Sequence, residues 1–197
     1  RPYLYKLTVA THTEAAAFNV GFRSVEIRNN QLLVNGKAIL VKGANRHEMN
    51  PERGYALTYE DMLRDIKIMK EHNLNAVRTC HYPDSPLWYD LCDKYGIYVV
   101  DEANIESHGM GYGDKSLAHR TDYTAAHLIR NQRVVLRDYN HPSVIIWSLG
   151  NEAGNGINFH QCYNWIKGYD KTRPVQYEQA SFISYKDIPK NFNSDIE

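Results

Sequence analysis

The pattern of apolar and polar positions changes near residue 30 of this 197-residue chain. Before that point, residues 3–9 and 20–27 are rich in β-branched and aromatic side chains, and their partial alternation predicts two strands. The turn dipeptides Asn29-Asn30 and Asn35-Gly36 then indicate a short hairpin, which pairs the apolar residues 32–34 with the run that begins at Ala38.

Beyond the hairpin, short apolar runs typical of buried strands alternate with amphipathic stretches typical of helices. The predicted strands are residues 39–43, 76–79, 97–100, 144–149 and 174–177. The predicted helices are residues 58–72, 85–96, 124–139 and 158–168. Strands that alternate with helices of this length predict βαβ units and a parallel sheet, which places the chain in the α/β class.

Local signals define the ends of two of these helices. Thr58 followed by Asp61 resembles a capping box, in which each residue bonds the backbone of the other. Ser85 followed by Pro86 predicts an N-cap and a proline in the first helical turn, and Gly96 predicts the end of that helix.

Two α/β folds fit this alternation, namely an open doubly wound sheet and a (β/α)8 barrel. The predicted strands begin about 34 residues apart and barrel units average about 31, but a doubly wound sheet gives similar steps. Polar side chains follow almost every strand, and in a barrel those strand ends converge on one mouth. The glycine-rich nucleotide motifs GxGxxG and GxxxxGK[ST] follow none of the strands. The sequence therefore favours a TIM barrel.

The predicted barrel is incomplete, because only about five βα units precede residue 180. Three more units would need roughly 95 residues. Ser194-Asp195-Ile196-Glu197 resembles the beginning of a sixth strand. We therefore expect a partial (β/α)8 barrel from a longer enzyme. A half barrel has open sheet edges, so we expect these residues alone to pair with another copy. We also expect the intact protein to be a homo-oligomer.

Composition narrows the classes of partner. Lys and Arg number 23, as do Asp and Glu, so the formal charge is zero, without the basic excess usual for nucleic-acid binding. The mean hydropathy of -0.58 and the short apolar runs predict no helix of about 18 apolar residues that spans a membrane. Cys80, Cys92 and Cys162 are widely spaced without a CxxC motif, which predicts reduced and largely buried thiols.

Several strand-end residues suit catalysis. Glu152 follows the most apolar predicted strand, and its carboxyl could serve as a general acid if apolar walls there raise its pKa. A solvated loop glutamate or a helix-capping one fits the same position. Glu106 and His108 lie two positions apart in an extended segment, so their side chains face the same side. Together with a third carboxylate they would suit Mg²⁺, Mn²⁺ or Zn²⁺. A hydrogen-bonded pair without a metal fits the sequence as well. His47 and His81 follow two other strands and fit either a structural or a functional role.

Five motifs occur at or near these strand ends. They are residues 45–48 (NRHE), 80–83 (CHYP), 101–109 (DEANIESHG), 140–152 (NHPSVIIWSLGNE) and 173–178 (RPVQYE). Together they closely resemble motifs of the β-galactosidases of glycoside hydrolase family 2. The resemblance extends from about Gly21 to Glu178, and the motif that ends in Asn151-Glu152 is its most specific part.

The resemblance implies a role for each matching residue in the hydrolysis of terminal β-galactosyl groups. By motif position, Glu152 corresponds to the acid/base of the family and Asn151 to the residue that contacts the sugar 2-hydroxyl. His47 and His81 correspond to histidines that stabilise the transition state. The residues that correspond to the ligands of an active-site Mg²⁺ are Glu106, His108 and Glu152.

The resemblance also implies a division of the chain. Residues 1–28 would be the end of an immunoglobulin-like β-sandwich, and residues 29–197 the N-terminal part of the catalytic barrel. Ser107 and Ala153 are mild departures from the family pattern, which often has Thr and Ser there. The nucleophile of the family is a second glutamate on a later strand. We therefore expect it beyond residue 197, since Glu178 does not match its motif, and we expect these residues alone to be inactive.

Two alternatives stay open at the level of the sequence. One is a sibling activity such as that of a β-glucuronidase, and the other is a noncatalytic carbohydrate-binding module. The stretches 101–109 and 148–150 resemble galactosidases more than glucuronidases.

Overall fold

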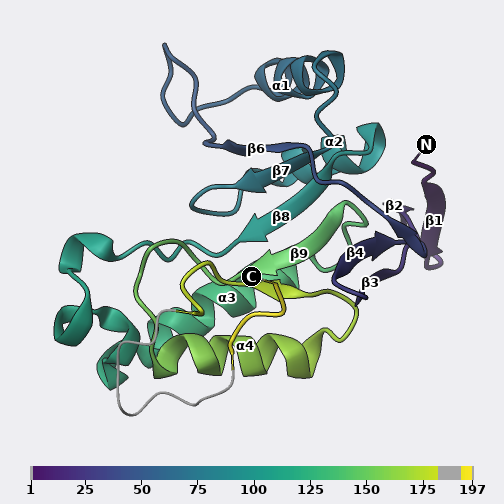
Figure 1. The fold of residues 1–197 in the computed structure, drawn as a ribbon. Coiled ribbons are helices and arrows are strands. Elements are labelled where there is room, and N and C mark those ends of the chain that lie inside the picture. Colours follow the sequence, from purple (N-terminus) through teal and green to yellow (C-terminus); the bar gives the residue numbers. More distant parts are fainter. Residues whose placement is uncertain (1, 182–191, 197) are drawn as a thin grey trace.

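The computed structural model describes residues 2–181 and 192–196, and its largest sheet has five parallel strands (Figure 1). These strands are β6 (Gly43–Arg46), β7 (Ala76–Thr79), β8 (Tyr98–Glu102), β9 (Val144–Ser148) and β10 (Val175–Gln176). The helices between them are α1 (Tyr59–Glu71), α2 (Pro86–Tyr95), α3 (Thr124–Asp138) and α4 (Ile157–Tyr169). The strand order β10-β9-β8-β7-β6 places each strand beside its predecessor. A doubly wound sheet would reverse its order, so this winding is that of a partial TIM barrel.

The N-terminal strands form two smaller antiparallel sheets beside the start of the barrel strands (Figure 1). One pairs β1 (Tyr5–Ala10) with β2 (Ala15–Val20). The other has β3 (Val25–Arg28), β4 (Gln31–Val34) and β5 (Lys37–Ala38). The predicted domain boundary after residue 28 coincides with the end of β3. The assignment of residues 1–28 to an immunoglobulin-like sandwich stays a prediction.

The prediction that residues 39–43 form the first barrel strand is wrong. The strand begins at Gly43, because its partner β7 begins at Ala76 and the register pairs these two residues. The preceding backbone bonds a side chain instead: the Asn75 amide accepts from the Lys42 N–H at 2.8 Å and donates to the Leu40 carbonyl at 2.9 Å. Leu40 is 71% exposed, so this apolar run is not a buried strand.

The prediction of one strand over residues 20–27 is also wrong. The structure divides this stretch between the end of β2 and β3, with residues 21–24 as a connection. At Gly21 the chain passes so close to Pro142 that a Cβ would lie 2.7 Å from its Cγ. The polar residues after β1 form a turn, in which the Thr11 hydroxyl accepts from the Glu14 N–H at 3.1 Å. This turn was the signal in the sequence that a second strand begins at Ala15.

The other elements lie within a few residues of their predicted bounds. Thr58 and Asp61 form the capping box of α1, and Gly96 ends α2 in the left-handed conformation with φ of 71°. Ser85 precedes α2 as expected, but its side chain makes no cap hydrogen bond. Its N–H bonds the Glu48 carboxylate at 3.0 Å.

The segment between β8 and α3 contains four short 3₁₀ turns that the sequence did not predict. They are η1 (His108–Met110), η2 (Gly113–Lys115), η3 (Leu117–His119) and η4 (Thr121–Tyr123). Beyond β10, Ile196 forms a parallel bridge with Gln176, in line with the start of another strand, whereas Glu197 lies outside the described residues. Over the described part of the chain, none of the helices is long and apolar enough to cross a membrane.

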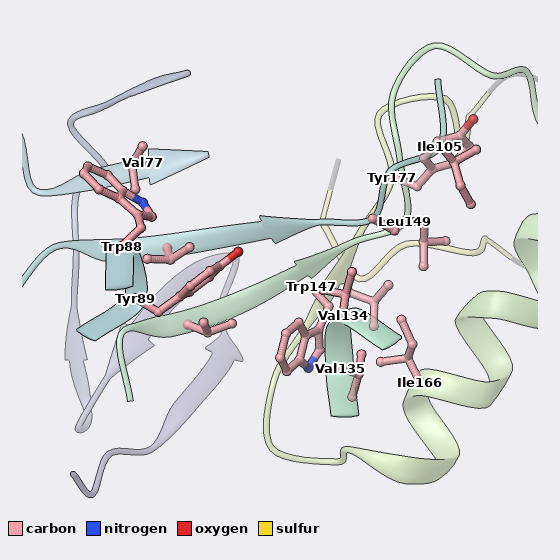
Figure 2. Close-up of a cluster of buried hydrophobic side chains, with 14 of the residues drawn as sticks. Val77, Trp88, Tyr89, Ile105, Val134, Val135, Trp147, Leu149, Ile166 and Tyr177 are labelled. Carbon is pink, nitrogen blue, oxygen red and sulfur yellow. The ribbon is translucent and has the colours of Figure 1, made fainter. Parts of the chain in front are cut away.

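The main core lies between the sheet and its helices (Figure 2). Trp147 of β9 meets Val134 and Val135 of α3 and Ile166 of α4 in this core. Trp88 of α2 is fully buried near β7 and β8. Burial of large aromatic side chains supplies much of the stability of such a core, so these two tryptophans serve packing. The three cysteines are free and buried, as predicted.

A buried polar network anchors Trp147. The Asp170 carboxylate accepts from Trp147 Nε1 at 2.8 Å, from Arg173 Nη1 at 2.7 Å and from the Thr172 hydroxyl at 2.6 Å. Burial alone would raise the pKa of Asp170, but these hydrogen bonds outweigh it and hold the pKa below its ordinary value of 3.8.

This network predicts an acid-sensitive contribution to stability. A carboxyl with a depressed pKa stabilises the fold fully above its unfolded pKa, and the contribution is lost as the pH falls through the folded pKa. We expect Asp170→Asn to lower the urea midpoint at about pH 7 and to lose less on acidification to about pH 3 than the wild type. Asp122→Asn, at an exposed ion pair with Arg120, is the control. Equal acid losses in wild type and Asp170→Asn would contradict the assignment.

Candidate active site

The residues at the carboxyl ends of the barrel strands converge, as the barrel prediction requires. His47 follows β6, His81 follows β7, Glu106 and His108 follow β8, and Asn151 and Glu152 follow β9. Contacts between these strand ends, including that of the His47 ring with the His81 ring, join four consecutive strands. In α/β barrels this end of the sheet holds the active site.

The deepest layer of the site is a buried carboxylate. Glu102, the last residue of β8, is fully buried and accepts from Arg78 Nε at 2.7 Å and from the Ser148 hydroxyl at 2.6 Å. Its other oxygen bonds Nδ1 of His81 at 2.8 Å and Arg78 Nη2 at 3.1 Å. An ionised carboxylate only accepts, so Nδ1 of His81 carries a proton and Nε2 is left for the mouth. Glu102 thus fixes the orientation of the His81 ring.

Arg78 extends this layer to the next strand end. Its Nη2 also donates to Asn151 Oδ1 at 2.9 Å, and Asn151 Nδ2 donates to Glu106 Oε1 at 3.0 Å. Neither Glu102 nor Arg78 is among the site residues predicted from the sequence. The available signal was an arginine inside an otherwise uncharged short strand, followed by a glutamate at the end of the next strand.

Glu106, His108 and Glu152 come together at the surface of the mouth. One potential ligand atom from each lies within 4.8 Å of the other two. Nδ1 of His108 is 3.8 Å from Glu106 Oε1 and 3.7 Å from Glu152 Oε2. The structure therefore brings together the three residues proposed as metal ligands, and their carboxylate and imidazole donors suit a hard or borderline divalent cation.

The backbone at the end of β9 makes this approach possible. Gly150 has φ of 147°, and a Cβ there would lie 2.6 Å from the Ile105 carbonyl oxygen. Only glycine avoids that clash. The Asn151 N–H then donates to the same carbonyl at 2.7 Å, which pairs the end of β9 with the segment that carries Glu106.

Among the residues that the structure describes, apolar side chains do not enclose Glu152. Its side chain is 55% exposed, because Glu152 lies beyond the strand in the left-handed region with φ of 41°. Its N–H donates to Glu178 Oε1 at 2.5 Å. Glu178 therefore lies beside Glu152 and supports its backbone.

His47 and His81 lie side by side at the β6–β7 side of the mouth, with ring centroids 5.4 Å apart. Two hydrogen bonds hold their segments together, from the Cys80 N–H to the Arg46 carbonyl and from the Glu48 N–H to the Tyr82 hydroxyl, both at 3.0 Å. Between the histidines in sequence, Cys80 is buried, and burial raises the pKa of its thiol.

A comparison of the sequence with protein-family models agrees with this barrel fold. The model of the TIM barrel domain of the family 2 glycosyl hydrolases matches residues 25–196. The chain belongs to glycoside hydrolase family 2.

The sequence of this family 2 chain is similar to those of several curated bacterial proteins. It is 53% identical to a β-galactosidase of Psychromonas ingrahamii and 54% identical to one of Vibrio vulnificus, in each case over 183 residues. Each alignment covers 90% of this chain and 18% of the relative. The chain thus spans less than a fifth of the length of these relatives.

Solved structures of the family show the same fold. A β-glucuronidase of Faecalibacterium prausnitzii superposes with a TM-score of 0.77 at 32% identity, over 89% of this chain and 31% of that protein. A β-galacturonidase of Eisenbergiella tayi superposes with a TM-score of 0.73 at 27% identity, over 89% and 32%. The family 2 barrel therefore accepts several sugars, and the fold does not choose among them.

Proposed function

We propose that the intact protein is a retaining β-galactosidase that releases terminal β-D-galactosyl residues. The observation that carries the proposal is the 53–54% identity to proteins named β-galactosidase across 90% of this chain. Two β-glucuronidases whose structures share its fold, from Faecalibacterium prausnitzii and Ruminococcus gnavus, are 32% and 27% identical in sequence, which makes glucuronide hydrolysis the second candidate.

In the proposed reaction, Glu152 acts first as a general acid and then as a general base. Its exposed carboxyl gives a proton to the glycosidic oxygen as the bond to the leaving group breaks, and later takes one from the water that releases galactose. Retention requires a second carboxylate about 5 to 5.5 Å away as the nucleophile. We assign that role to a glutamate of a later barrel strand, outside these 197 residues.

Other side chains in the mouth would bind and orient the sugar. Asn151 is held by Arg78 and Glu106, so its amide has a fixed direction for a hydrogen bond to the 2-hydroxyl. His81, oriented by Glu102, presents Nε2, and His47 lies beside it. We assign to these two imidazoles hydrogen bonds to sugar hydroxyls that are stronger in the transition state than in the ground state.

Glu106, His108 and Glu152 would hold the Mg²⁺ of the proposed enzyme. When bound, the ion would supply positive charge beside the acid/base carboxyl. Two carboxylates and an imidazole whose ligand atoms lie within 4.8 Å of one another fit such an ion.

We expect Glu106→Gln to weaken Mg²⁺ binding and the dependence of turnover on Mg²⁺, since it removes one anionic ligand. A calorimetric Mg²⁺ titration of the intact protein, alongside activity during EDTA and Mg²⁺ titrations, measures both effects. Glu26→Gln makes the same charge change at β3, beside the start of the barrel strands, and is the control. Unchanged Mg²⁺ affinity in Glu106→Gln would remove the metal assignment.

A paired assay tests the proposed activity. The intact protein should hydrolyse nitrophenyl β-galactoside in strong preference to the matching β-glucuronide, with β-galactose as the first product. The reverse preference would assign the protein to the glucuronidases. Galactose binding without hydrolysis of either substrate would indicate a noncatalytic carbohydrate-binding protein.

A further inference from the structure

A second cluster of potential metal ligands lies in the same mouth, on the side of β6 and β7. One ligand atom from each of His47, Cys80 and His81 lies within 4.8 Å of the other two. The three residues come from two neighbouring strand ends, whose segments are held in register by backbone hydrogen bonds. None of the three belongs to the group of Glu106, His108 and Glu152.

The histidine orientations favour metal binding at this cluster. The Nδ1 of His81 donates to the buried Glu102 carboxylate, which leaves Nε2 with its lone pair. The Nδ1 of His47 lies 3.5 Å from the Tyr82 hydroxyl, and the two rings are nearly perpendicular at 83°. A metal-bound histidine usually has its second nitrogen bonded to a carboxylate or another acceptor, which fixes the ring and raises its basicity.

The donor atoms of this cluster select a different ion from those of Glu106, His108 and Glu152. A thiolate and two imidazoles suit Zn²⁺, Co²⁺ or Cu²⁺, whereas Mg²⁺ prefers oxygen ligands. Three protein ligands of the Cys and His type leave a fourth tetrahedral position open to water or another ligand. His47 is exposed, so an ion can reach the cluster from solvent, while Cys80 closes its inner side.

We propose that His47, Cys80 and His81 form a binding site for Zn²⁺ or a similar borderline-soft divalent ion, distinct from the oxygen-rich group in the same mouth. On binding, the Cys80 thiol gives its proton to solvent and its sulfur bonds the ion, together with one nitrogen from each histidine. The inference that such an ion inhibits hydrolysis rests on the proposed function, because it would occupy two imidazoles that bind sugar.

Cobalt tests the site without relying on activity. Co²⁺ added to the intact protein in excess Mg²⁺ should give a thiolate-to-cobalt absorption band that saturates at a single ion per chain and disappears when Zn²⁺ is added. Cys80→Ser should abolish the band, and His47→Ala should weaken Co²⁺ binding at least about tenfold. Cys162→Ala, which removes a buried thiol on α4, is the matched control and should keep the band.

The outcomes separate this proposal from the proposed function. Absence of the band in the wild type, or its persistence in Cys80→Ser, would overturn the metal site whatever the enzyme hydrolyses. If the band behaves as expected, Zn²⁺ should inhibit galactoside hydrolysis at lower concentration in the wild type than in Cys80→Ser, by at least about tenfold. Equal inhibition of the wild type and Cys80→Ser would show that the ion bound at Cys80 does not block the histidines that bind sugar.

Discussion

Replacing Glu152 with glutamine in the intact protein should lower the hydrolysis of natural galactosides by about 10²- to 10⁴-fold, the usual contribution of a positioned acid or base. The loss should be much smaller for nitrophenyl galactosides, because nitrophenolate leaves without a proton whereas a sugar alkoxide does not. Comparison of kcat/KM for the two substrate types measures the acid role directly.

Azide tests the second role of Glu152. In the glutamine variant the galactosyl intermediate should accumulate, because no base activates water for its release. Azide attacks without a base and should restore turnover on the activated substrate, with a β-configured galactosyl azide as product. The control Glu26→Gln should hydrolyse both substrate types at the wild-type rate, and azide should not change its turnover. Equal losses on both substrates without azide rescue would show that Glu152 has a structural or metal-binding role only.

Removal of the Glu102 carboxylate should be among the most destabilising changes in the barrel. Glu102→Ala leaves the Arg78 guanidinium without its buried partner and frees the His81 ring, and loss of one member of a buried ion pair costs about 3 to 5 kcal/mol. The urea midpoint should fall at an unchanged slope.

Glu106→Ala is the matched control for Glu102→Ala. Glu102 ends β8 and Glu106 follows it four residues later. The Glu106 side chain is 37% exposed, so removal of its carboxylate should lower the free energy of unfolding by about 1 kcal/mol or less. If Glu102→Ala does not fold, the isosteric Glu102→Gln keeps one oxygen that accepts from Arg78 and loses the other, so it should show an intermediate loss. Similar midpoints for the Glu102 and Glu106 variants would reject the buried layer as a source of stability.

The amino-acid sequence by itself determined the helices and most of the barrel strands, and it supplied the residues that we propose for the site. Thr58, Asp61 and Gly96 act through their own neighbours in the chain, so their effects are readable without a fold. The alternation of apolar runs and amphipathic stretches reflects burial on one face of each element and predicts a parallel sheet. The motif that ends in Asn151-Glu152 identified the family before any distance was known.

Only the tertiary structure decided what depends on pairing between distant segments. The first barrel strand begins at Gly43 because β7 begins at Ala76, a register that no local run encodes. Glu102 orients His81 and Arg78 across strand ends, and the close approach of Gly150 to Ile105 joins the end of β9 to the segment that carries Glu106. Likewise, His47 meets Cys80 and His81 only through the approach of β6 to β7. These contacts join residues that are far apart in the sequence, so they exist only once the chain has folded. The arrangement of the side chains in the mouth depends on them.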